Sequence, residues 1–173
     1  YSKVEKASAE PEASSMIETF RAIGYSVETA VADIVDNSIT AGSKNIWIDY
    51  HWDGPNTTFS VLDDGTGMNG HELINAMRPG SSNPLDQREA DDLGRFGLGL
   101  KTASFSQSRK FSVVSMKAGF QSVCWSWDLD FVNLERSWTL IKYCPEESKY
   151  HELIRARKHG TAVIWWDLDR LTK

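Results

Sequence analysis

The sequence predicts an α+β fold, a two-layer sandwich in which a mixed, mostly antiparallel sheet carries helices on one face. Three observations lead to this prediction. Helix-type periodicity is concentrated early in the chain, strand-type alternation dominates the later part, and the strands are joined by short, turn-like links. A regular alternation of strands and helices would instead have indicated a parallel, Rossmann-type sheet.

The elements follow one another along 173 residues. Residues 1–12 are polar and contain Pro11, so we expect a loosely held arm ahead of one domain spanning residues 13–173. Because the first residue is Tyr1 and not Met, we expect the chain to be a fragment of a longer protein. The expected helices span residues 14–23, 27–41, 70–77, 98–106 and 146–158. The expected strands span residues 45–52, 57–62, 110–117, 122–129, 139–144 and 161–168.

Local signals set the boundaries of these elements. Ser26 fits the N-cap of the second helix, and Gly24 and Gly42 fit the ends of the first two helices. Segment 122–129 alternates apolar with polar residues, which predicts one buried and one solvated face. Residues 79–97 combine Pro, Gly and Ser with charged residues, and such a long loop is typical of a lid or a binding loop.

Composition narrows the function classes. No stretch approaches the roughly 20 apolar residues of a membrane helix, so no membrane partner is expected. The net charge of −5, from 24 acidic and 19 basic residues, argues against a domain that coats nucleic acid. Cys124 and Cys144 lack metal-ligand spacing. We expect them to be reduced thiols of a cytoplasmic protein, with one disulfide in an oxidising compartment as the alternative.

The second helix carries a narrow polar stripe. Asp33, Asp36, Asn37 and Thr40 share one side of a helical projection whose remainder is apolar. The stripe lacks the Lys and Glu that usually cover exposed helices, so we expect it to face a cleft; an ordinary solvated face is the alternative. The Asn37 carbonyl suits Mg²⁺, and the Asp33 carboxylate one turn earlier could orient a water molecule. The expected apolar half contains Val27, Ala30, Val31, Ile34, Val35 and Ile39.

A first glycine motif follows the second strand. The Asp63 carboxylate there could accept a hydrogen bond from an exocyclic amine, and Gly65 and Gly67 would let the backbone approach a flat ring. On its own the motif is also compatible with an ordinary strand-to-helix turn. It offers too few oxygen ligands for a calcium loop.

A second glycine motif, GRFGLGLK at residues 94–101, precedes a helix. Its glycines let backbone N–H groups turn toward an anion, and the helix N-terminus adds a partial positive charge. Lys101 would sit in the first turn, where a bound phosphate would compensate its charge; a glycine hinge with an exposed lysine is the alternative. The spacing matches neither a Walker A loop nor the dinucleotide fingerprint.

Taken in order, DIVDN, DDGTG, GRFGLGLK and a Thr after Gly in a late strand resemble the four motifs of the GHKL superfamily, over roughly residues 16–168. That superfamily includes type II topoisomerases, heat-shock chaperones of the ninety-kilodalton class, histidine kinases and MutL-type repair proteins. AVADIVDNSITAG and GRFGLGLKTASFSQS are most similar to Microrchidia-like and related prokaryotic, HSP90-like ATPases. The resemblance implies a Bergerat fold that binds ATP and Mg²⁺.

The resemblance also implies roles for individual residues. Asn37 would bind Mg²⁺ and, through it, the triphosphate. Asp63 would take the adenine amine, with Thr161 supporting its carboxylate directly or through water. The base pocket would be lined by Gly65, Gly67 and Met68. The phosphates would be wrapped by Gly94, Arg95, Phe96, Gly97, Leu98, Gly99 and Leu100 and paired with Lys101.

Asp33 stands where the family usually has its general base, a Glu four residues before the Asn. We therefore expect an ATPase with Asp33 as the catalytic residue, weak in this fragment because many relatives add a lysine from a second domain. Closure of the lid at 79–97 would gate an ATP-dependent homodimer or the engagement of a DNA or protein client. The alternatives are a non-hydrolysing, nucleotide-dependent binding module and a histidine-kinase catalytic domain.

Overall fold

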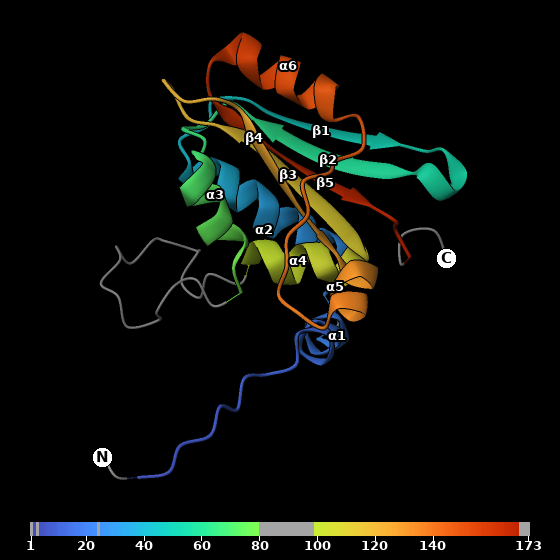
Figure 1. Ribbon diagram of the computed structural model, residues 1–173. Coiled ribbons are helices and arrows are strands. Elements are labelled where there is room, and N and C mark those ends of the chain that lie inside the picture. Colours follow the sequence, from blue (N-terminus) through green and yellow to red (C-terminus); the bar gives the residue numbers. More distant parts are fainter. Residues whose placement is uncertain (1, 3, 24, 80–98, 170–173) are drawn as a thin grey trace.

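The computed structural model describes residues 2, 4–23, 25–79 and 99–169 (Figure 1). The helices are α1 (Ala13–Ala22), α2 (Val27–Thr40), α3 (Gly70–Met77), α4 (Gly99–Gln107), α5 (Leu129–Glu135) and α6 (Glu147–Arg157), with a short 3-10 turn at Gly54–Asn56. The strands are β1 (Ile46–His51), β2 (Thr58–Asp63), β3 (Lys110–Met116), β4 (Val123–Asp128) and β5 (Gly160–Trp166). None of these helices is long and apolar enough to cross a bilayer.

The strands form one sheet in the order β1-β2-β5-β3-β4, and every neighbouring pair is antiparallel. The last strand of the chain therefore lies at the centre of the sheet, between β2 and β3. This insertion sets Asp63, at the end of β2, directly opposite Thr161 on β5. Two residues almost 100 positions apart in the sequence thus become cross-strand neighbours.

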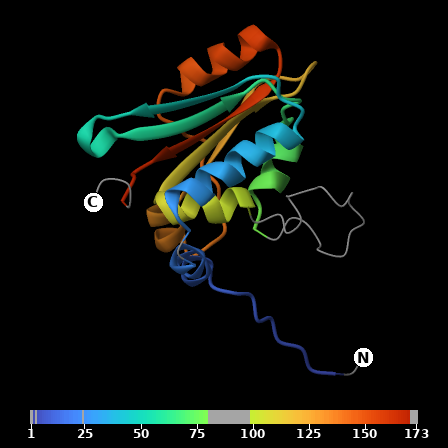
Figure 2. The ribbon, with the colours of Figure 1, turned by 180° about the vertical axis from the view of Figure 1, so that it is seen from behind.

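Helices α1 to α5 lie on one face of the sheet, with α2 and α4 directly beneath it (Figures 1 and 2). Large aromatic side chains fill the core between these layers. The Phe59 and Trp165 ring centroids are 4.7 Å apart, and Phe105 meets Phe111 edge-on at 5.0 Å. The buried Trp165 indole N–H donates to Ser104 Oγ at 2.9 Å, so its polar atom is satisfied inside the core.

Helix α6 covers the opposite face of the sheet, where it buries Tyr150 and Ile154 against the strands (Figure 1). The predicted α+β class and antiparallel sheet are confirmed, and α6 adds a helix outside the single helical layer that was expected. The prediction that the polar face of segment 122–129 is solvated is wrong at Cys124 and Ser126, because α6 and the segment before it enclose both residues. Ser126 Oγ donates to Ser112 Oγ at 2.7 Å within this second core.

The predicted strand at residues 139–144 is wrong. Only Ile141 forms a bridge, to Ser126 at the edge of the sheet. Trp138 and Leu140 pack against the core of the α1–α5 face, whereas Cys144 packs on the α6 face. The segment therefore wraps around the sheet edge and does not run along it. Helix α5, which the sequence analysis missed, begins just before this segment.

The Asp128 side chain caps α5 by accepting hydrogen bonds from the backbone N–H groups of Asp130 and Phe131, at 2.9 and 3.1 Å. The other predicted elements are present within one or two residues of their expected boundaries. Ser26 caps α2 as predicted, since its hydroxyl accepts from Thr29 N–H at 3.2 Å.

Candidate functional site

A cavity of about 520 Å³ lies between α2, α4 and the sheet. Pockets for small molecules typically enclose roughly 300–1,000 Å³, so the volume of this cavity suits a nucleotide-sized ligand. The predicted site residues that line it are Asn37, Asp63, Gly67, Met68, Gly99, Leu100, Lys101 and Thr161. The four segments that the motifs mark in the sequence therefore contribute to one cavity.

The remaining predicted site residues fall into two groups. Asp33 and Gly65 lie near the cavity but do not line it. The other group, Gly94, Arg95, Phe96, Gly97 and Leu98, lies outside the described residues, as does most of the predicted lid at 79–97.

Asp63 supplies the carboxylate among the described residues that line the cavity, and 5% of its surface is exposed. Its Oδ2 accepts from the Ser38 hydroxyl at 2.7 Å, and its Oδ1 accepts from Gly65 N–H at 2.9 Å. Burial raises the pKa of Asp63, and the hydrogen bonds from Ser38, Gly65 and the Thr161 backbone partly offset that rise. A carboxylate has about four acceptor positions, so Asp63 can accept a further donor from the cavity.

Ser38 is a site residue that the sequence analysis missed. It lies one turn after Ile34 on the inward face of α2 and is 3% exposed. The signal was available, because a serine at that position of an apolar stripe needs a polar partner inside the fold.

Two expectations about the apolar half of α2 are wrong. Val27 and Ile39, predicted to be buried, are 37% and 60% exposed.

The turn after Asp63 depends on glycines that allow close backbone approach. At Gly65, an added Cβ would lie 2.7 Å from Ser43 Oγ and 2.9 Å from the Ala41 carbonyl oxygen. Gly67 has φ +67°, and a Cβ there would overlap the carbonyl group of Met116. These glycines therefore press the turn against α2 and β3, so they position Asp63 and the following Met68.

A hydroxyl pair fixes the opposite wall of the cavity. Thr161 Oγ1 lies 2.8 Å from Ser115 Oγ, which also accepts from Met68 N–H at 2.8 Å. The Thr161 hydroxyl thus joins β5 to β3 and to the Gly67–Met68 turn. The hydrogen bond by which Thr161 supports the Asp63 carboxylate comes from the Thr161 backbone. The sequence analysis did not identify Ser115.

Asn37 projects from α2 at the mouth of the cavity, where it is exposed. Asp33 is half-buried one turn earlier on the same helix. It faces Tyr25, whose pKa is raised by burial and then by the hydrogen bond and negative charge of Asp33. Tyr25 is therefore a neighbour of the predicted base that the sequence did not reveal.

Lys101 enters the cavity from the first turn of α4. The residue is 2% exposed, and its Nζ donates to the Ala76 carbonyl oxygen on α3 at 3.0 Å. Burial lowers the pKa of Lys101 to about 8. Lys101 therefore brings a positively charged group into the wall of the cavity.

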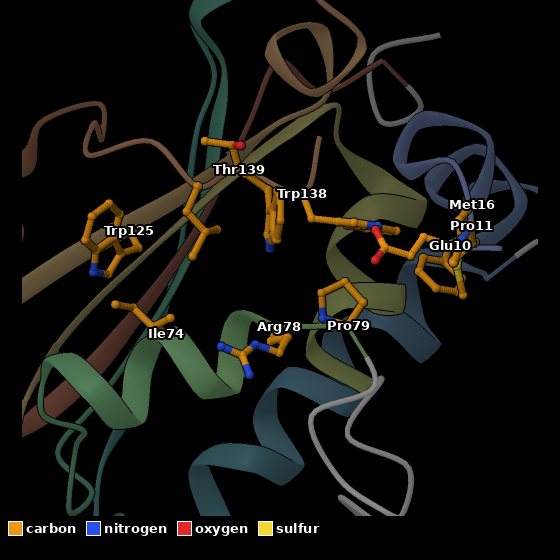
Figure 3. Close-up of a pocket in the computed structure, with 12 residues that line it drawn as sticks. Glu10, Pro11, Met16, Ile74, Arg78, Pro79, Trp125, Trp138 and Thr139 are labelled. Carbon is orange, nitrogen blue, oxygen red and sulfur yellow. The ribbon is translucent and has the colours of Figure 1, made fainter. Parts of the chain in front are cut away.

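A larger cavity, of about 1000 Å³, opens between α1, α3 and the loop after α5 (Figure 3). Trp125, Trp127 and Trp138 dominate its walls, and its charged lining residues are Glu10 and Arg78. None of the predicted site residues lines it. Asn37, Asp63 and Lys101 instead converge on the smaller cavity, which is therefore the candidate nucleotide site.

Comparison with known proteins identifies the family to which the sequence is similar. The model of a family described as histidine kinase-, DNA gyrase B-, and HSP90-like ATPase matches residues 25–161. The ATPase morc-1 of Caenorhabditis elegans is 35% identical over 92 residues, covering 53% of this chain and 10% of that protein. The chaperone protein HtpG of Rickettsia canadensis is 32% identical over 105 residues, covering 55% of this chain and 16% of that protein.

HtpG of Treponema denticola is 37% identical over 93 residues, covering 48% of this chain and 14% of that protein. The chain thus spans only a small part of the length of each of these relatives.

Proposed function

Because the chain belongs to the family of histidine kinase-, DNA gyrase B- and HSP90-like ATPases, we propose that its cavity beside α2 binds Mg-ATP and that the whole protein hydrolyses it slowly. One observation carries the proposal. The buried Asp63 carboxylate lies in the wall of the same cavity as Lys101 and Asn37. An adenine-binding acceptor, a phosphate-binding cation and an amide oxygen are therefore available to one ligand.

The adenine ring binds at the Asp63 end of this cavity. Its exocyclic amine donates to Asp63, whose oxygens are already oriented by Ser38 and Gly65. Met68, Val113 and Val163 supply apolar surface along the cavity for the faces of the ring. A preoriented acceptor favours adenine over guanine, which presents a carbonyl oxygen at the corresponding position.

The phosphates extend toward α4. Helix α4 begins at Gly99. The space beside this residue is open, because a Cβ added to it would have no described atom within 4 Å. A helix N-terminus with free backbone N–H groups attracts anions, and Lys101 adds a full positive charge. Residues 94–98, which the resemblance assigns to phosphate binding, are part of this proposal.

Asn37 is the residue that would hold Mg²⁺. Magnesium keeps several waters and shares its remaining positions between a protein oxygen and substrate phosphates. When bound, the ion would neutralise negative charge on the triphosphate.

Asp33 is the proposed general base for hydrolysis, and it would polarise a water molecule next to the terminal phosphate. Nucleotide binding would gate homodimerisation or the engagement of a DNA or protein client through the predicted lid at 79–97. The name of the relative morc-1, an ATPase, supports turnover in the whole protein.

A non-hydrolysing binding module is the second candidate function. The observation that favours it is the position of Asp33, which faces Tyr25 and lies outside the cavity lining. Phosphate release by the full-length protein separates the two functions. Turnover that saturates with ATP supports the ATPase, whereas tight ATP binding without phosphate release supports the binding module.

A further inference from the structure

Strand β1 forms an open edge of the sheet. It pairs with β2 on one side, and no described strand pairs with it on the other (Figures 1 and 2). An edge strand carries unpaired N–H and C=O groups along its free side, and these can pair with another strand. Proteins usually protect such edges with charges, prolines or bulges.

The edge of β1 is apolar and exposed. Trp47 is 41% exposed, Ile48 54% and Tyr50 44%, and Trp52 just beyond the strand is 63% exposed. On one side of the strand, Ile46, Ile48 and Tyr50 face the α2 layer, because Ile46 packs against that core. Large apolar side chains along a free edge indicate a surface that another strand covers.

The other side of β1 carries charges. The Arg157 guanidinium of α6 lies 4.3 Å from the Trp47 ring centroid. Asp49, two residues along on the same side of the strand, lies close enough to Lys149 of α6 to interact with its charge. The Lys149 Nζ also lies 3.3 Å from Oε2 of Glu146, the N-cap residue of α6. The edge therefore presents Asp49 near Lys149 and the Arg157 guanidinium over Trp47, and Arg157 is the cation that a second carboxylate would approach.

We propose that β1 pairs with β1 of a second copy of this chain, antiparallel and centred on Ile48. A two-fold axis perpendicular to the sheet then sets Ile48 opposite itself and Ile46 opposite Tyr50 on the α2 side. On the α6 side, Asp49 of each copy lies opposite Trp47 of the other, next to the Arg157 that stacks on that ring. The two sheets become one continuous sheet.

Charge complementarity selects this register. A pairing centred on Asp49 would place the two carboxylates directly opposite each other, and like charges at that position are destabilising. The register centred on Ile48 instead gives two Asp49–Arg157 pairs by symmetry. It also keeps all five central pairs, from residue 46 to residue 50, within the strand.

This dimer goes beyond the proposed ATP-dependent one, because β1 contributes no residue to the 520 Å³ cavity. It forms without nucleotide. Its failure and the failure of the proposed ATP binding are therefore separate results, each measurable on the same protein.

A cysteine at the two-fold axis tests the register. Directly opposed residues of an antiparallel pair have Cα atoms about 4.5–5.5 Å apart, within the range of a disulfide. Ile48→Cys should therefore form a disulfide-linked dimer under mild oxidation, on a non-reducing gel. Tyr50→Cys should not, because its two copies would lie about 13 Å apart. The native cysteines Cys124 and Cys144 are buried and serve as the wild-type control.

A charge exchange tests the contacts, with the dimer constant measured by analytical ultracentrifugation without nucleotide. Asp49→Arg and Arg157→Asp should each weaken dimerisation about ten-fold or more, and the double variant should recover most of that loss. Glu152→Arg, the same charge reversal on the exposed side of α6, should leave the constant unchanged. A monomer at every concentration, equal cross-linking at positions 48 and 50, or no recovery in the double variant would overturn the proposal.

Discussion

Two consecutive carboxylates show how the fold divides roles between neighbouring residues. Asp63 points into the core beside the cavity, where Ser38 and Gly65 hold it. Asp64 points away and accepts from the backbone N–H groups of Lys44 and Asn45, at 2.8 and 2.9 Å. Hydrogen bonds, those from Asn45 first, lower the pKa of Asp64 to about 2. Asp64 therefore anchors the loop before β1, and Asp63 is free to bind a ligand.

This division gives a matched pair of substitutions. Asp63→Asn should weaken ATP binding about 10- to 150-fold, because a charge-assisted hydrogen bond of roughly 1.5–3 kcal/mol is replaced by a weaker one. Asp64→Asn changes the same chemistry one residue away and should leave the affinity within about two-fold of wild type. Calorimetric titration with ATP measures both. Equal losses in the two variants would remove Asp63 from the pocket.

Lys101 should make nucleotide binding depend on pH. Its lowered pKa of about 8 means that the ammonium loses its proton in the free protein as the pH rises above 8. Bound phosphates favour the charged form and raise that pKa, so binding takes up protons in this range. ATP affinity should therefore fall above pH 8, by up to about ten-fold per pH unit.

Titrations in buffers of different ionisation enthalpy would measure the proton uptake. Lys101→Met should abolish this proton uptake, and Lys117→Met, outside the cavity, should not.

The lowered pKa of Lys101 also affects the stability of the fold. Between pH 8 and the ordinary pKa of 10.5, the unfolded chain binds more protons at this residue than the folded one, so Lys101 makes stability rise with pH there.

Asp33 carries the hydrolysis part of the proposal. In the full-length protein, Asp33→Asn should reduce turnover about 10²- to 10⁴-fold while ATP affinity is retained, since general-base assistance contributes on that scale. Asp36→Asn lies on the same polar side of α2 and is the control. Phosphate release at saturating ATP measures both variants. Undiminished turnover in Asp33→Asn would assign the base elsewhere.

At the scale of elements, the sequence predicted those that local signals define. Ser26 and the glycine after α2 marked its boundaries. The strand predicted around Ile141 is absent. The apolar residues of this segment pack on both faces of the sheet edge, which gives the segment a strand-like composition. The exposure of Ile39 also could not be predicted, since periodicity shows which side of a helix is apolar but not which element covers it.

The turn after β2 tests how far the glycines position the site. Gly67→Ala combines a positive φ with a Cβ that overlaps the Met116 carbonyl, so the strand-turn packing must open. Gly42→Ala has a similar φ of +74° but nothing within 4 Å, so it reports the conformational cost alone, roughly 1–2 kcal/mol. Gly67→Ala should lose clearly more stability in chemical denaturation, and ATP binding with it. Equal losses would show that the contact with Met116 is unimportant.

At the scale of the whole molecule, the sequence could indicate which motifs carry chemistry but not how they meet. The order β1-β2-β5-β3-β4 places Thr161 next to Asp63, and a non-local pairing of this kind has no local signature. The resemblance to a family implied that the motifs converge on one site, which their spacing alone could not predict. The contacts of Ser38 and Ser115 were not predicted, because a serine inside an apolar pattern shows its partner only after the chain has folded.

The convergence of Asn37, Asp63 and Lys101 on one nucleotide cavity is tested most directly by a crystal structure of the protein with Mg²⁺ and a non-hydrolysable ATP analogue. The adenine amine should lie within hydrogen-bonding distance of an Asp63 carboxylate oxygen, with the phosphates beside Lys101 and the ion on the Asn37 amide oxygen. A nucleotide bound in the tryptophan-lined cavity, or one bound with its base away from Asp63, would contradict the account.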